Sequence, residues 1–199
     1  MSIKGSITTS NYIDYDKALN KGLSLMEKKR DEHYINYSKM NREEIIGFYI
    51  ITSINLGLRI GDILTLKFED FRKGYKTFRE QKTEKAKTVK FNETILKAFD
   101  KFYGSSKRTG YVFTSQKGGV LSRQQVNRLL KQIFKSKDKN ISSHSLRKSF
   151  GRRVYEKNNE SDKALLMLNE IYNHSSIAQT RKYLDITQEE INSVYESIC

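Results

Sequence analysis

The 199-residue chain contains no proline. Proline interrupts helices because it lacks a backbone N–H and its ring clashes with the preceding turn, and average proteins contain about 5% of it. Its absence leaves glycine and asparagine to mark the ends of elements and favours a mostly helical fold. Residues 45–58 are apolar almost all round, which predicts a central buried helix, and Asn41 with Glu44 forms a capping-box pattern before it.

Shorter periodic segments predict the rest of the fold. Residues 75–81 and 87–91 have strand-like patterns and are joined by a lysine-rich turn, so we expect a hairpin or a three-stranded sheet. We therefore predict a mainly α (α+β) fold with a small antiparallel sheet. Further helices are expected at residues 17–31, with Leu19, Leu23 and Met26 on one face, at 92–103, from Ser122, from Ser143, at 161–172, around Tyr183 and from Thr187.

Charge and cysteine content limit the function classes. The 37 basic residues exceed the 23 acidic residues by 14, and the sequence pI is about 9.7, so nucleic acid is the first expected partner. The single cysteine, Cys199, excludes an internal disulfide framework and a multi-cysteine metal site, which fits a reducing cytoplasm. No apolar run approaches the roughly 18 residues that span a bilayer, and no signal-peptide core is present, so we expect neither membrane insertion nor secretion.

Histidines and cations carry the candidate chemistry. His33, His144 and His174 lack the close spacing of zinc ligands, and the chain has neither a nucleotide phosphate-binding loop nor a nucleophile elbow. His144 and Arg147 lie three apart at a predicted helix start, where free backbone N–H groups already favour an anion such as phosphate. Arg59 follows the apolar helix. Taken alone, any one of these residues is more often structural than functional.

Four segments matter because they occur together and in order: LGLRIGDILTL at 56–66, QKTEKAKTVKF at 81–91, HSLRKSF at 144–150 and NHSSIAQTRKYLDI at 173–186. They resemble the boxes of the tyrosine recombinase, or phage integrase, family over about residues 40–199. In that family the first box has the form G-L-R-x-x-E/D-L and a hairpin carries a lysine. The second box reads H-x-L-R, and a histidine precedes the nucleophilic tyrosine by nine residues. The matching positions here are Arg59, Lys82, His144, Arg147, His174 and Tyr183.

The resemblance implies a role for each matching residue. Arg59 and Arg147 would clamp the scissile phosphate of DNA, and Tyr183 would be the nucleophile. Forming a tyrosyl phosphate conserves the bond energy, so rejoining needs neither ATP nor a metal, and no cofactor is expected. The remaining implied roles are protonation of the leaving oxygen by Lys82, hydrogen bonding to the phosphate or proton movement by His144 and His174, and a hold on Arg59 by Asp62.

Two positions depart from the family pattern. Lys148 stands where many members have a second histidine, and Asn173 replaces the usual glycine before His174. Asparagine tolerates a left-handed, helix-ending conformation nearly as well as glycine. A shift of the hairpin register would give Lys85 the role of Lys82. The predicted DNA contacts are Arg123, Arg128 and Lys131 on one helix face, with Lys85 and Lys148.

The resemblance also implies partners and a domain division. The implied partners are double-stranded DNA and accessory DNA-bending proteins. The chain would form a homo-tetramer on DNA, and the free protein could be a monomer. We expect residues 1–40 to form an N-terminal segment with a peripheral helix, without a complete DNA-gripping domain, and residues 41–199 to form the catalytic domain. The expected activity is integration, excision or inversion of a mobile DNA segment. A type IB topoisomerase and a catalytically inert DNA-binding regulator stay open as alternatives.

Overall fold

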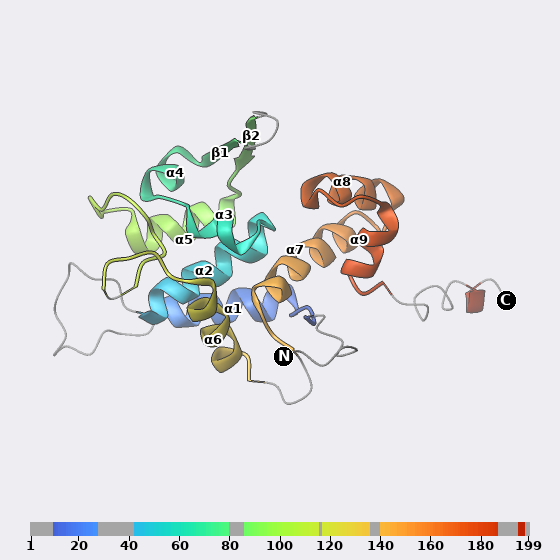
Figure 1. Ribbon diagram of the computed structural model, residues 1–199, viewed down its shortest axis with the longest axis horizontal. Coiled ribbons are helices and arrows are strands. Elements are labelled where there is room, and N and C mark those ends of the chain that lie inside the picture. Colours follow the sequence, from blue (N-terminus) through green and yellow to red (C-terminus); the bar gives the residue numbers. More distant parts are fainter. Residues whose placement is uncertain are drawn as a thin grey trace.

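The computed structural model describes residues 10–27, 42–79, 86–115, 117–135, 140–186 and 195–197. This part of the chain is mostly helical with one small sheet, as predicted (Figure 1). The elements are α1 (Tyr15–Glu27), α2 (Arg42–Leu56), α3 (Ile60–Leu64), α4 (Phe68–Lys73), β1 (Tyr75–Arg79), β2 (Ala86–Lys90), α5 (Glu93–Tyr103), α6 (Arg123–Ile133), α7 (Ser143–Lys157), α8 (Asp162–Tyr172) and α9 (Ile177–Tyr183).

Helix α2 is the centre of the larger core. Every residue from Glu44 to Leu56 is buried, which confirms the predicted central helix. The Phe48 ring lies among aromatic rings from other elements, with centroids 5.0 Å from Phe71 and 5.3 Å from Tyr103. Such tilted and edge-to-face pairs are favourable beyond their buried area. Asn41, the first residue of the predicted capping box, lies outside the described residues.

Helix α1 packs along α2 and contributes one face to this core. Ala18, Leu25 and Met26 are buried, whereas Leu19 and Leu23 of the predicted face are only partly buried. The buried face is therefore rotated from the predicted one, because α2 offers a long apolar partner whose position the local pattern does not encode. The last predicted residues of this helix lie outside the described residues, so the division of the chain between residues 40 and 41 stays a prediction.

The predicted hairpin is confirmed as an antiparallel pair of β1 and β2, with Tyr75 opposite Lys90 and Arg79 opposite Ala86. Phe78 and Val89 are packed against the larger core. The connecting turn, residues 80–85, lies outside the described residues. The positions of Lys82 and Lys85 therefore stay predictions.

Helix α7 joins the larger core to a smaller one built with α8 and α9, at the right of Figure 1. Its N-cap is Ser142, whose hydroxyl accepts from the His144 N–H, so the predicted cap at Ser143 was one residue late. Ser145 completes the capping box. Phe150 of α7 packs on Gly57, which has a φ of 59°, and any Cβ at this position would collide with the phenyl ring. This close approach brings the loop after α2 against α7.

Candidate active site

Arg59 and Arg147 converge on one oxygen atom. The Arg59 Nη2 donates to the Tyr172 carbonyl at 3.2 Å, and the Arg147 Nη2 lies 3.4 Å from the same oxygen. Arg59 is exposed and is the N-cap residue just before α3, whereas Arg147 lies in the second turn of α7 and is buried. The structure thus brings together two arginines that lie 88 positions apart in the sequence.

Besides accepting a hydrogen bond through its carbonyl, Tyr172 contacts Arg147 through its ring and its hydroxyl. The Arg147 guanidinium lies 4.4 Å from the centroid of the Tyr172 ring, and the Tyr172 hydroxyl donates to the Arg147 carbonyl at 2.7 Å. A cation over an aromatic face is attracted by the negative face of the ring. Tyr172 is fully buried, so this contact holds the guanidinium of Arg147 in one place.

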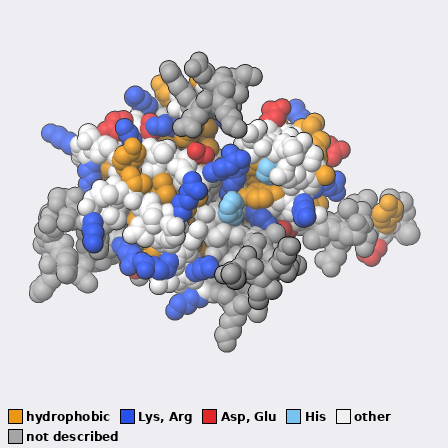
Figure 2. All heavy atoms as spheres, in the orientation of Figure 1, with side chains coloured by type: hydrophobic (Ala, Val, Ile, Leu, Met, Phe, Trp, Pro, Cys, Tyr) orange, Lys and Arg blue, Asp and Glu red, His pale blue; other side chains and the backbone are white. Residues whose placement is uncertain are grey.

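Three cationic side chains lie at the carboxyl end of α8. Lys87 of β2 donates to the Ile171 carbonyl at 3.3 Å, next to the Tyr172 carbonyl that takes both arginines. The last carbonyl groups of a helix carry partial negative charge and lack partners within the helix. Arg59, Arg147 and Lys87 therefore form a site that attracts negative charge, and the carboxyl end of α8 occupies this site. Figure 2 shows Lys and Arg side chains across this face, with histidine side chains beside them.

Both predicted imidazoles lie within electrostatic range of the arginines. Although part of the His144 side chain is exposed, burial of the rest lowers its pKa, and the charge of Arg147 lowers it further. Burial also lowers the pKa of His174, and Arg147 and Arg59 act in the same direction. Both histidines are accordingly neutral at pH 7 in this structure.

Tyr183 ends α9 with its ring inside the site. Its centroid is 5.2 Å from the rings of both Tyr172 and His174. No described residue makes a hydrogen bond of normal geometry to the buried Tyr183 hydroxyl, although the Arg147 guanidinium is near enough to act on it. Burial raises the pKa of Tyr183 to about 12, against the opposing effects of Arg147 and Arg59. The phenol is therefore neutral in this conformation.

Lys148 does not face the solvent, contrary to its predicted role as a DNA contact. It is 3% exposed, and its Nζ lies 2.8 Å from both carboxylate oxygens of Asp185. The ammonium group also lies 5.5 Å from the centroid of the Tyr183 ring. A buried ammonium needs a partner, and the chain supplies one just after α9. Lys148 therefore ties α7 to the end of α9.

The predicted hold of Asp62 on Arg59 is not seen: within the described residues no ion pair joins them. Asp62 instead acts on Arg147, where its negative charge favours the protonated guanidinium, against the burial that lowers the pKa of Arg147. The predicted hold of Asp62 on Arg59 therefore stays a prediction.

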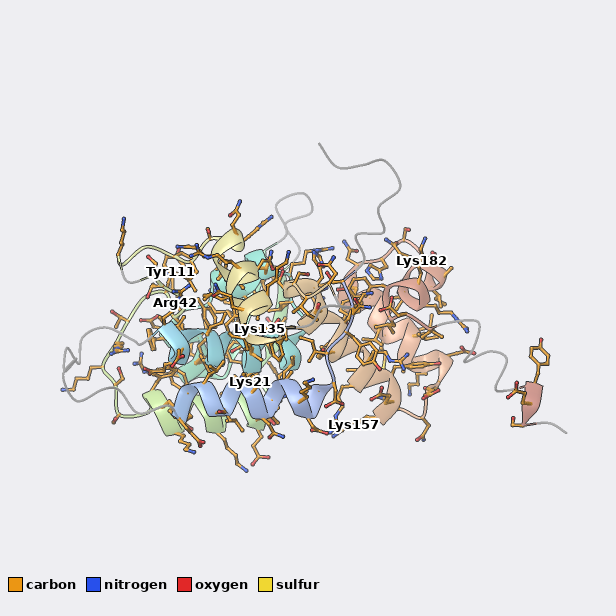
Figure 3. All side chains as sticks on the ribbon, turned by 90° about the horizontal axis from the view of Figure 1, so that it is seen from below. Lys21, Arg42, Tyr111, Lys135, Lys157 and Lys182 are labelled. Carbon is orange, nitrogen blue, oxygen red and sulfur yellow. The ribbon has the colours of Figure 1, made fainter. Side chains whose placement is uncertain are left out.

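The predicted basic face of α6 is exposed, with Arg123, Arg128 and Lys131 toward solvent. Arg128 also lines a small pocket with Arg42 and Lys117, which sequence reasoning did not single out. Figure 3 shows Arg42 and Lys182 toward opposite ends of the molecule, so this pocket lies away from α9. Sequence reasoning also missed Tyr172, Thr180 and Asn169, because a tyrosine before a helix end and two polar residues in helices give no signal of their own.

The matched residues of the sequence boxes that the structure describes lie close together. The model of the phage integrase family matches residues 48–190. The chain belongs to the phage integrase family. It is 29% identical over 160 residues to the probable integrase/recombinase YoeC of Bacillus subtilis, covering 79% of this chain and 86% of YoeC.

Solved structures of other recombinases share the fold of this integrase-family chain. The crystal structure of XerA recombinase has a TM-score of 0.64 at 18% identity, covering 99% of this chain and 66% of XerA. XerH bound to its palindromic difH substrate, in a post-cleavage complex, has a TM-score of 0.58 at 21% identity. That match covers 94% of this chain and 53% of XerH. Family and fold together support site-specific recombination.

In the described ranges no group of three or more His, Cys, Asp or Glu side chains is placed to hold a metal ion. None of the described helices combines the length and apolar character needed to cross a membrane.

Proposed function

We propose that the protein is a site-specific recombinase that cleaves and rejoins double-stranded DNA through a covalent 3'-phosphotyrosine at Tyr183. One observation carries this proposal. The guanidinium groups of Arg59 and Arg147 share a single oxygen, within electrostatic range of both imidazoles and of the Tyr183 phenol. A phosphate oxygen that displaces the Tyr172 carbonyl would meet the same donors.

The two arginines suit a phosphodiester better than lysines would. A guanidinium is planar, keeps its charge at any biological pH and can bind two oxygens at once. Negative charge gathers on the non-bridging oxygens in the transition state, and preorganised donors aimed at them are each worth about 10²–10³ in rate. Arg147, stacked on Tyr172, has that preorganisation before DNA binds.

The proposed reaction is a transfer between two oxygens on phosphorus. The Tyr183 Oη attacks the phosphorus, the bond from phosphorus to the 5'-oxygen breaks, and the leaving oxygen takes a proton, which we assign to Lys82. Because Tyr183 is neutral, its proton must leave during the attack, and His144 and His174 either take it up or hydrogen-bond the phosphate. Rejoining reverses these steps with another 5'-hydroxyl and uses no ATP.

DNA would lie across the cationic face. We propose that Arg123, Arg128 and Lys131 of α6 contact the phosphate backbone, together with Arg42 and Lys117 beside them. Affinity should then fall steeply with salt, because each neutralised phosphate releases a counterion. Assembly as a homo-tetramer on DNA, with accessory DNA-bending proteins, belongs to the same proposal, and the DNA-bound XerH structure supports the choice of partner.

A nicked suicide substrate tests the proposal, since loss of the short cleaved end traps the intermediate. Denaturing gels should show a protein-linked DNA strand for the wild type and none for Tyr183→Phe. Tyr111→Phe is the matched control, because Tyr111 is a surface residue 45% exposed and its variant should still form the adduct. An adduct that persists in Tyr183→Phe would reject this nucleophile.

Two further assays separate the alternatives. Recombination of paired sites on one plasmid supports the recombinase, whereas relaxation of supercoils without recombination would assign the chain a topoisomerase activity. DNA binding with no adduct on any nicked substrate would make it a catalytically inert regulator.

A further inference from the structure

Three polar side chains connect α8, the loop after it and α9. The Asn169 Nδ2 donates to the Thr180 Oγ1 at 3.3 Å, and that oxygen lies 3.0 Å from the Nδ1 of His174. Thr180 is completely buried. Asn173, in the left-handed conformation with φ 54° and ψ 51°, turns the chain after α8 so that His174 faces α9.

The donors and acceptors in this chain of contacts determine where the protons lie. A threonine hydroxyl has one proton to give, and its lone pairs accept. Since the Asn169 amide already donates to the Thr180 oxygen, the Thr180 proton is free to point at the Nδ1 of His174. The hydrogen bonds described for the Thr180 hydroxyl are these two, so the Nδ1 of His174 is the acceptor described for its proton. An Nδ1 that accepts must leave the proton of a neutral imidazole on Nε2.

We propose that Thr180, held by Asn169, is a positioning residue that fixes His174 as the neutral tautomer protonated at Nε2. This role rests on the function proposed above, in which the Nε2–H donates to a non-bridging oxygen of the scissile phosphate. No described residue hydrogen-bonds the Nε2 atom, so this donor is available. His174 was given two possible roles, proton uptake and donation to the phosphate. The tautomer with the proton on Nε2 suits donation to the phosphate before DNA binds.

The neutral state of His174 supports the same assignment. Burial and the charges of Arg147 and Arg59 lower its pKa, so the ring is neutral at pH 7. Its single ring proton then lies on either Nδ1 or Nε2. The groups packed around the ring are the Tyr172 and Tyr183 rings, each 5.2 Å away, and neither offers a competing hydrogen bond to Nδ1.

Nitrogen NMR of the 199-residue protein without DNA tests the proposal without requiring catalysis. Two-bond ¹H–¹⁵N correlations at pH 8 should show one tautomer for His174, with Nδ1 unprotonated and Nε2 protonated. Thr180→Val, which replaces the hydroxyl with a methyl group, should lose this single pattern, and Thr180→Ser should keep it. A His174 signal with the proton on Nδ1 would overturn the proposal.

Cleavage of the nicked substrate provides the second readout. We expect Thr180→Val to slow adduct formation about 10- to 100-fold, less than the roughly 10²–10³-fold loss that follows removal of a donor. Thr180→Ser should recover most of the rate. Thr52→Val is the matched control, because Thr52 is equally buried, its hydroxyl has no hydrogen-bond partner among the described residues, and it lies on α2.

The two readouts fail in distinguishable ways. Wild-type cleavage with an unchanged rate in Thr180→Val would overturn the positioning role. Absence of cleavage in the wild type would count against the proposed function, while the NMR result would still decide whether Thr180 sets the tautomer.

Discussion

The ion pair between Lys148 and Asp185 connects the end of α9 to α7. The Lys148 side chain is 4% exposed and that of Asp185 35% exposed, with 2.8 Å between Nζ and the carboxylate. Asp185 has a φ of 54°, which asparagine also tolerates. Asp185→Asn therefore removes the negative charge with little change in shape or backbone strain, and leaves the buried ammonium group without its counter-charge.

The cost follows from the burial of each partner. Removing one member of a fully buried ion pair costs about 3–5 kcal/mol, because the other charge is left unpaired. Since Asp185 is about a third exposed, water screens part of the charge of the pair, and we expect about 2–3 kcal/mol. For a chain of this size, that loss corresponds to a fall in Tm of about 4–12 °C.

Thermal and denaturant unfolding measure this change. Glu27→Gln is the control, because its ion pair with Lys101 lies on the surface, with side chains 53% and 59% exposed, and should contribute less than about 1 kcal/mol. The double variant Lys148→Met with Asp185→Asn should recover stability relative to Asp185→Asn, since it leaves no unpaired charge. If Asp185→Asn melts at the wild-type temperature, the buried pair does not hold α9 to α7.

Other substitutions separate ionisation, packing and DNA contact. A tyrosine whose folded pKa of about 12 exceeds its unfolded value near 10 stabilises the fold below pH 10, and this contribution is lost as the pH rises through 12. Tyr183→Phe should therefore lose less stability than the wild type between those pH values in denaturant titrations, and equal losses would contradict the burial. Gly151→Ala would place a methyl group against the Tyr172 hydroxyl and 2.5 Å from the Leu184 Cδ2. We expect a net loss of about 1–2 kcal/mol after the gain in helix propensity, and a higher Tm would contradict this packing. Arg128→Gln should make the negative slope of log affinity against log salt less steep by about 1 in DNA titrations, because one phosphate contact is lost. An unchanged slope would contradict a DNA contact by Arg128.

Local signals were enough to predict several elements. The α2 run is apolar on all faces and is buried on all faces. Asn92 and Ser122 cap their helices through hydrogen bonds to residues three positions later, as their side chains favour in any context. Asn173 takes the left-handed conformation for the same local reason. These features depend on neighbours within a turn of the chain, which a sequence displays directly.

Contacts between distant elements were harder to predict. The buried face of α1 depends on α2, and the burial of Lys148 depends on Asp185, 37 positions later. Tyr172 contacts Arg147 through both its ring and its hydroxyl, but its sequence neighbours show only the end of a helix. The site could be predicted because the four family boxes occur together and in order. Asn169 lies outside these boxes, and Thr180 lies within the last box but is not one of its matched positions.

The identity of the covalently linked residue tests the central claim most directly. Protease digestion of the trapped adduct, followed by mass spectrometry, should find the nucleotide 3'-phosphate on the peptide that contains Tyr183. The same peptide should be unmodified when Arg147 is replaced by alanine, because the phosphate would then lose its buried donor. A nucleotide attached to any other side chain would contradict the account of a phosphate held between Arg59, Arg147 and the Tyr183 phenol.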